Sequence, residues 1–168
     1  PLYLPGYDWL AITYEKKFNT NFAEKTLEQA LSISPRSVKR LKKYAGLCFE
    51  NKHFEKATDA YQQVYDLAFN SIHHAPENAM LFAQSLASYS SELPLAEAIK
   101  KNNTAFSMFS QINKNFRQPG VKIQSHLLSA CLLENIHEYI VAKSKLKLGL
   151  KLLEKEQYNI DSQSLKEI

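Results

Sequence analysis

The chain has 168 residues, 45% of them hydrophobic and 23% charged, and a formal net charge of +4. This composition is typical of a globular domain with a core of its own, and no apolar run approaches the roughly 20 residues that a membrane-spanning helix needs. Only 4 glycines and 6 prolines are present, which disfavours a turn-rich β-sandwich and favours helices with short connections.

Apolar residues at helical spacing predict four helices in the range 1–70. The first runs from Asp8, which we expect to be its N-cap, to about Phe18. The second begins at Phe22 and stops near Ser34-Pro35, because a residue before proline avoids the helical region. The third and fourth occupy the ranges 36–50 and 54–70, with a turn at 51–53.

Four more helices are expected in the second half. Pro76 and Pro94 are natural helix starts, and the first of these helices ends in a Ser-rich turn at 88–91. After Pro119-Gly120 the pattern predicts a seventh helix through Leu133 and an eighth from Tyr139. The range 157–168 is polar and is expected to fray.

Small residues recur at a fixed period along the chain. Ala23 and Ala57 are separated by a period of about 34 residues, the length of one helix-turn-helix unit in a solenoid. Ala11 precedes Ala23 by the same shorter distance by which Ala45 precedes Ala57, and this distance returns between Ala130 and Ala142. The period therefore indicates stacked helical hairpins, in which small residues lie where helices touch. We expect these alanines to be buried.

The sequence of the second unit resembles the tetratricopeptide (TPR) motif, with Leu41, Tyr44, Ala45, Phe49, Phe54, Ala57, Tyr61 and Val64 at matching offsets. The first unit fits the same register through Tyr7, Leu10, Ala11, Tyr14, Ala23, Leu27, Ala30 and Pro35. The last unit fits more loosely through Ala130, Leu133, Tyr139, Ala142, Leu146 and Gly149. Two departures are Lys52, which stands where the motif usually has glycine, and the stretched third unit.

This resemblance implies an all-α, right-handed α-α superhelix, a TPR-like solenoid of about four helical hairpins. The expected repeat domain is 1–156, with units at 5–35, 36–70, 76–117 and 119–156, followed by the polar tail 157–168. TPR domains hold other proteins, so the resemblance implies a non-catalytic scaffold for protein–protein interaction.

The same resemblance places the first helix of each hairpin along a concave groove. It implies a partner-binding face made of Lys39, Lys42, Phe49 and Glu50 in the second unit and of Asp8, Ile12 and Glu15 in the first. Asp8 and Ile12 stand where carboxylate-binding TPR proteins carry lysine and asparagine, so that clamp is absent. The cluster Arg36, Lys39, Arg40, Lys42 and Lys43 either contacts an anionic partner or is a solvated basic face, which is the commoner case.

We expect no metal, no cofactor and no catalytic site. His73-His74 lacks the carboxylates or further imidazoles that would complete a ligand set. Cys48 and Cys131 lie in apolar helical stretches, where free cysteine acts as a small hydrophobe, and neither belongs to a disulfide framework, which favours a reducing cytoplasm. The sequence shows no glycine-rich phosphate loop and no nucleophile with its base.

Several alternatives stay open. The lysine-rich helix from Tyr139 is either a membrane-surface helix or, as we prefer, the solvated cap of the solenoid, with Ile140, Leu146, Leu150 and Leu153 on its apolar side. Helical repeats also bind single-stranded RNA, although the mild net charge argues against a nucleic-acid partner here. Exposed aromatic residues on a terminal repeat could pair two chains into a homodimer.

A narrower resemblance concerns 35–40 and 76–78, which look like the TPR region that follows the receiver domain in some bacterial response regulators. It implies a cytoplasmic module of two-component signal transduction. The chain begins Pro1-Leu2-Tyr3 without a methionine or a leader, which is consistent with a piece of a longer polypeptide.

Overall fold

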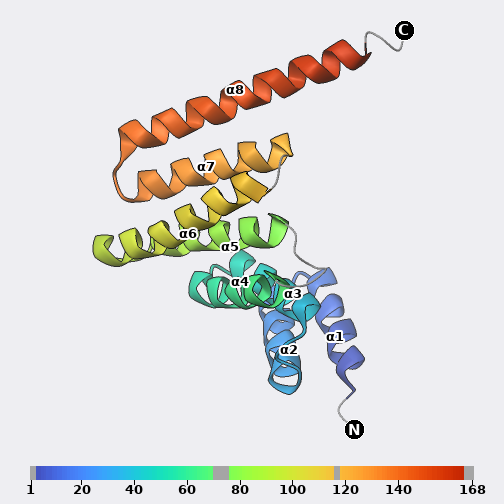
Figure 1. Cartoon of the computed structure of the whole chain (residues 1–168). Helices are drawn as coiled ribbons and strands as arrows, with labels where there is room; N and C mark the ends of the chain where they lie inside the picture. The colour runs from blue at the N-terminus through green and yellow to red at the C-terminus, as the bar shows by residue number, and fades with distance from the viewer. Residues whose placement is uncertain (1–2, 70–75, 116–117, 165–168) are drawn as a thin grey trace. The chain divides into compact units, whose positions relative to one another are not determined.

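The computed structural model describes residues 3–69, 76–115 and 118–164, which form eight α-helices and no strand (Figure 1). In chain order they are α1 (Leu4–Lys16), α2 (Thr20–Ile33), α3 (Val38–Glu50), α4 (Phe54–Phe69), α5 (Pro76–Ser90), α6 (Leu95–Asn115), α7 (Pro119–Asn135) and α8 (Tyr139–Ser164). The expected all-α class is confirmed.

Three of the hairpins turn through the same backbone conformation. Phe18, Lys52 and His137 have φ of 55°, 63° and 63°. The residue after each of them donates its N–H to a carbonyl near the end of the preceding helix, as from His53 N to Cys48 O at 2.8 Å. This bond closes the last turn of the first helix and sends the chain back along it. Lys52 therefore occupies a left-handed position that glycine would take without strain.

The repeating alanines are all buried, as predicted. Ala11, Ala23, Ala45 and Ala57 have no exposed surface, and Ala130 and Ala142 are nearly as covered. A methyl group at these positions lets two helices approach closely, so the period of the alanines records the contacts within and between hairpins.

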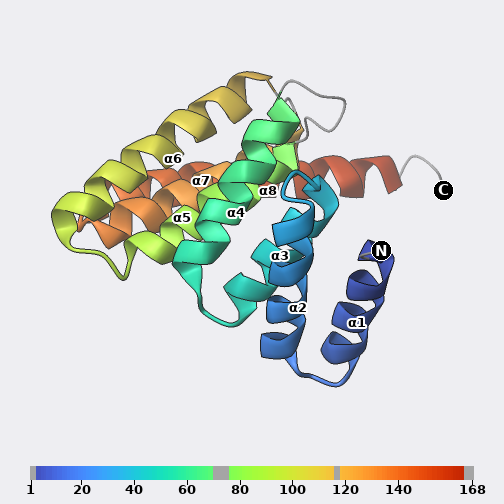
Figure 2. The ribbon, with the colours of Figure 1, turned by 90° about the horizontal axis from the view of Figure 1, so that it is seen from below.

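The chain divides into two compact units, 1–85 and 86–168, and the boundary falls inside α5. In the first unit α1 packs against α2, α2 against α3, and α3 against α4 (Figure 2). The first turns of α5 complete this unit, where the rings of Tyr65 and Phe82 lie 6.1 Å apart. Both hairpins predicted for the range 1–70 are thus present.

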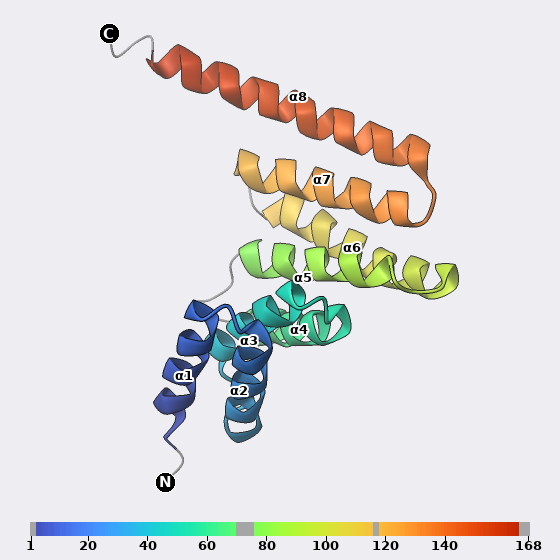
Figure 3. The ribbon, with the colours of Figure 1, turned by 180° about the vertical axis from the view of Figure 1, so that it is seen from behind.

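In the second unit α6 packs against α7, and α7 runs beside α8 (Figures 1 and 3). Two asparagine amides satisfy carbonyls near helix ends. Asn102 of α6, which is fully buried, donates to Leu132 O of α7 at 2.9 Å. Asn135 donates to Ala87 O of α5 at the same distance. Such polar joints lie outside the apolar TPR pattern.

The last helix differs from the sequence prediction in two ways. α8 continues to Ser164 through most of the expected polar tail, because no proline or glycine after Gly149 interrupts it. The predicted apolar side is also wrong, since Ile140, Leu146, Leu150 and Leu153 are exposed. α8 turns Ala142 and Gly149 toward α7 instead, and a Cβ at Gly149 would lie 3.5 Å from His126 Cβ. Small residues permit this close contact, and the leucines flank it.

Candidate functional site

The groove face of α3 consists of Lys39, Lys42, Gly46, Phe49 and Glu50, spaced so that they share one side of the helix. Both lysines and Glu50 are exposed, while Phe49 is half-buried. The Phe49 ring meets the Phe54 ring edge-on, with centroids 5.3 Å apart, which fixes it against the start of α4. The residues predicted for the second hairpin therefore lie together on α3, and the ring of Phe49 is held in place.

A hollow of about 190 Å³ opens on this face. It is lined by Gly46, Phe49, Glu50, Tyr61, Leu81 and Gln84. Because Gly46 has no side chain, the hollow reaches down to Tyr61 of α4, whose hydroxyl would lie 3.7 Å from a Cβ at position 46. Burial, followed by the nearby Cys48 and Glu50, raises the pKa of Tyr61. Its hydroxyl therefore stays protonated at neutral pH.

Sequence reasoning did not identify Leu81 and Gln84, which α5 adds to the hollow. The signal that could have pointed to the site is Gly46 itself. A glycine in the middle of an otherwise large-residue helix costs helical stability and often marks a close approach or a binding surface. Which helix faces that glycine is decided by tertiary packing.

Two of the three groove residues expected from α1, Asp8 and Glu15, form ion pairs with α3. Asp8 accepts two hydrogen bonds from the Arg40 guanidinium, at 2.8 and 2.9 Å, and Glu15 lies 2.6 Å from Lys43 Nζ. Ile12, which lies between Asp8 and Glu15 in the sequence, is half-buried. Asp8 and Glu15 thus join α1 to α3.

Asp8 is also not an N-cap. α1 begins at Leu4, since Pro5 fits the first turn of a helix, where its missing N–H costs nothing. Asp8 therefore lies one turn inside α1, and its carboxylate binds Arg40 instead of a backbone N–H.

These ion pairs divide the four basic residues of the cluster that lie on α3 into two groups. The hydrogen bond with Asp8, which outweighs the effect of burial, raises the pKa of Arg40. Arg40 and Lys43 are committed to the first hairpin, whereas Lys39 and Lys42 form no ion pair with any carboxylate in the described ranges. Only the latter two remain available on the groove face for a partner.

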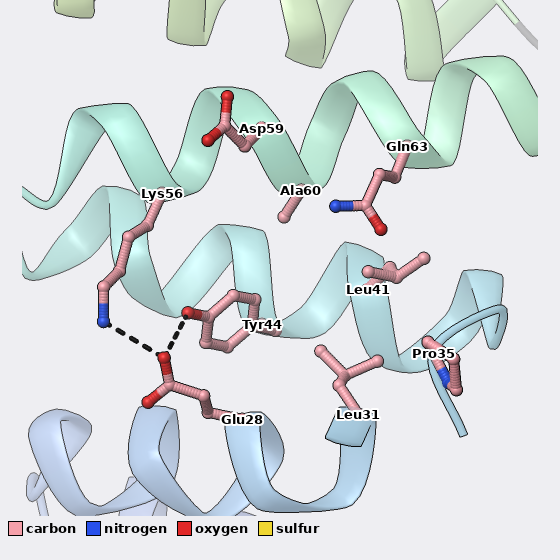
Figure 4. Close-up of a pocket in the computed structure, with 9 residues that line it drawn as sticks. All are labelled: Glu28, Leu31, Pro35, Leu41, Tyr44, Lys56, Asp59, Ala60 and Gln63. Atoms are coloured by element: carbon pink, nitrogen blue, oxygen red, sulfur yellow. Dashed lines mark hydrogen bonds and ion pairs between the residues drawn. The ribbon is translucent and has the colours of Figure 1, made fainter. Parts of the chain in front are cut away.

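A larger hollow, about 270 Å³, lies between α2, α3 and α4 of the first unit (Figure 4). Three of its polar side chains, Glu28, Tyr44 and Lys56, form bonds with one another. The Tyr44 hydroxyl donates to Glu28 Oε1 at 3.3 Å, and Lys56 Nζ donates to the same oxygen at 3.2 Å. Because these groups satisfy one another, we assign this hollow to the joint between the two hairpins.

Glu24 is the centre of that joint. Its carboxylate, only 5% exposed, accepts a hydrogen bond from Asn51 Nδ2 at 2.6 Å and lies 2.9 Å from His53 Nδ1. Burial acts to raise the pKa of Glu24, but the bonds to Asn51 and His53 and the charges of His53 and Lys56 together lower it. The side chain is therefore ionised at neutral pH and fastens α2 to the turn between α3 and α4.

The structure offers little for catalysis or metal binding in the residues that it describes. No three histidine, cysteine, aspartate or glutamate side chains in the described ranges gather in a way that could hold a metal ion. His73-His74 lies outside those ranges. Burial raises the pKa of Cys48 to about 12, which leaves this thiol unreactive. Cys131 is exposed, contrary to the expectation of an apolar environment.

Among the described helices, none is long and apolar enough to cross a membrane. No protein-family model matches the sequence, and no curated protein matches it significantly.

Solved structures are similar in fold. The nearly identical TPR-like repeats of a putative kinesin light chain from Podosopora anserina share 14% identity, with a TM-score of 0.74 over 92% of this chain and 76% of that one. A structure described as MamA MSR-1 C2 gives 15% identity and a TM-score of 0.66, covering 88% and 75%. PilF of Pseudomonas aeruginosa gives 22% and 0.56, covering 88% and 60%. The fold is therefore an array of TPR-like helical hairpins.

Proposed function

We propose that this chain is a non-catalytic scaffold that holds a segment of another protein against the groove face of α3. The observation that carries the proposal is the coincidence of two kinds of contact on one helix side. Lys39 and Lys42 are exposed cations without a described carboxylate partner, and the hollow at Gly46 follows one turn later. An acidic segment with an apolar side chain for the hollow fits this arrangement.

The chemistry of the hollow supports one inserted side chain. Phe49 and Leu81 supply apolar wall, while Tyr61, Glu50 and Gln84 supply polar groups near its mouth and floor. Pockets that combine apolar lining with a few placed polar groups are typical of specific recognition. The lysines would act at longer range by speeding the encounter with an acidic partner.

A test starts from a phage-displayed library of random peptides panned on the protein. Peptides that bind should be acidic with an apolar residue, and the double variant Lys39→Glu, Lys42→Glu should lower their affinity at least tenfold because it reverses both charges. The matched control is Lys143→Glu, Lys147→Glu on α8, two exposed lysines that do not belong to the groove face, which should leave the affinity unchanged. Equal binding by wild type and the Lys39, Lys42 variant, with both folded, would refute the site.

A separate binding measurement with single-stranded RNA tests the nucleic-acid alternative. Arg40 and Lys43 are held by Asp8 and Glu15, which leaves fewer cations for phosphates than the sequence cluster suggested. We therefore expect weak binding of single-stranded RNA, and a tight complex whose affinity falls steeply with salt would favour the nucleic-acid alternative.

The finer proposal is that this scaffold is the partner-binding module of a bacterial two-component protein in the cytoplasm. It rests on the sequence resemblance at 35–40 and 76–78 and on two free cysteines, which suit a reducing compartment. A receiver domain encoded upstream of Pro1 would support it, and a signal peptide there would overturn it.

A further inference from the structure

The first hairpin carries large apolar side chains that no other helix of the first compact unit covers. Trp9 and Leu10 of α1 and Phe22 of α2 are 69%, 45% and 53% exposed. Single exposed apolar residues are ordinary, but several large ones together mark an interaction surface. Lys17, the residue that follows α1, is also exposed.

The repeat itself shows what these positions do in the second hairpin. A shift by one repeat converts Trp9, Leu10, Lys17 and Phe22 into Lys43, Tyr44, Asn51 and Lys56. All four of the latter contact the preceding hairpin. Lys43 pairs with Glu15, Tyr44 and Lys56 bind Glu28, and Asn51 binds Glu24. We call the side formed by Trp9, Leu10, Lys17 and Phe22 the end face.

The charges of the first hairpin are distributed unevenly. All four acidic side chains of residues 3–34, Asp8, Glu15, Glu24 and Glu28, bind groups of the second hairpin. The exposed cations Lys16, Lys17 and Lys25 have no carboxylate partner among the described residues. Lys25 lies near the end face, with its Nζ 6.0 Å from the centre of the Phe22 ring. The end face is therefore apolar and cationic, without an acid.

We propose that the end face binds an amphipathic α-helix of another protein, whose apolar stripe is flanked by carboxylates. The joint inside this chain has the same chemistry, because α2 brings Glu24 and Glu28 to cations and amides of the following hairpin. A bound helix would cover Leu10 and Phe22 and place a carboxylate near Lys17. This surface is distinct from the groove face of α3.

A second copy of the chain fits the end face poorly. In a two-fold symmetric pair each end face would meet another that is equally cationic. The acidic residues of the first hairpin could not compensate for this repulsion, because the second hairpin already binds them. Charge therefore favours an acidic partner over self-association.

Trp9 provides the readout, since it is the only tryptophan of the chain and lies on the end face. The probe is a synthetic helix of about 20 residues with leucine at i, i+3, i+4 and i+7 and glutamate beside the leucines. We expect a saturable blue shift of Trp9 emission as the ring leaves water. The same peptide with lysine in place of glutamate should cause no shift.

The matched variants are Lys17→Glu and Lys16→Glu, two neighbouring exposed lysines at the end of α1. Lys17→Glu should weaken binding of the glutamate peptide at least tenfold by calorimetry, whereas Lys16→Glu should weaken it at most twofold. Lys16 corresponds to Glu50 of the second hairpin, which is on the groove side, so it tests simple proximity of charge. Circular dichroism checks that both variants are folded.

Four results would overturn the proposal. The first is that the glutamate peptide causes no saturable shift of Trp9 emission. The second is that the glutamate and lysine peptides bind equally well. The third is that Lys17→Glu and Lys16→Glu lose the same amount of affinity for the glutamate peptide. The fourth is a blue shift caused by another occupant. That shift would appear on raising the protein concentration alone if a second copy covers the face, or with vesicles of phosphatidylcholine and phosphatidylserine alone if a lipid surface does.

Discussion

The joint at Glu24 gives the sharpest test of what holds the first two hairpins together. Replacing Glu24 by alanine removes the acceptor for Asn51 Nδ2 at 2.6 Å and the partner of His53 at 2.9 Å. Hydrogen bonds to a charged group contribute about 1.5–3 kcal/mol each, and the half-exposed His53 recovers part of its loss by hydration. We therefore expect Glu24→Ala to lower the free energy of unfolding by about 2–4 kcal/mol.

Glu28 supplies a matched control, because it lies one turn later on the same helix. Its carboxylate also has two partners, Tyr44 at 3.3 Å and Lys56 at 3.2 Å, but its side chain is 51% exposed. Water replaces such bonds readily, so Glu28→Ala should cost at most about 1 kcal/mol. Urea unfolding followed by circular dichroism and by Trp9 emission measures both values. Equal losses in the two variants would show that burial of Glu24 is not what makes its bonds strong.

The sign of the pH dependence follows from the lowered pKa of Glu24. Since this pKa is below the usual 4.5, the ionised carboxylate stabilises the fold above that pH, and the contribution is lost as pH falls through the folded-state pKa. The stability difference between wild type and Glu24→Gln should therefore be largest near neutral pH and should shrink in strong acid. A difference that stays constant with pH would contradict this account.

Three further substitutions test the helices around the groove. Gly46→Ala should raise the free energy of unfolding by about 0.5–1 kcal/mol, because a Cβ there meets only Tyr61 at an ordinary 3.7 Å, and a lower urea midpoint would contradict this. Lys52→Gly should add about 0.5–1 kcal/mol by relieving φ of 63°, unless thermal melting shows a loss. Ala57→Leu should cost about 1–3 kcal/mol by overpacking a fully buried contact, and an unchanged melting temperature would count against the repeat register.

The second hairpin shows why its site could be predicted only in part. The residues Lys39, Lys42, Phe49 and Glu50 share a helix side by spacing alone, and the structure places them together. The hollow beside them depends on Leu81 and Gln84, which come from α5. No local pattern in α3 specifies which later helix will pack beside Gly46.

The ion pairs of the first hairpin also could be predicted only in part. Sequence grouped five cations at 36–43 as one basic surface, because it could not show that Asp8 and Glu15 lie opposite Arg40 and Lys43. Each of these pairs joins the first hairpin to the second, across most of a repeat. An ion pair of this kind depends on where two helices cross, which is a property of the packed hairpins.

The amino-acid sequence by itself determined the eight helices and the buried alanines, because helical periodicity, prolines and small residues act locally or recur at the fixed period of the repeat. Tertiary structure alone decided the burial of Glu24 and the side of α8 that meets α7. Both depend on the relative rotation of neighbouring helices. A helix with leucines, lysines and small residues has more than one side that can pack, and contact at Ala142 and Gly149 allows the closer approach.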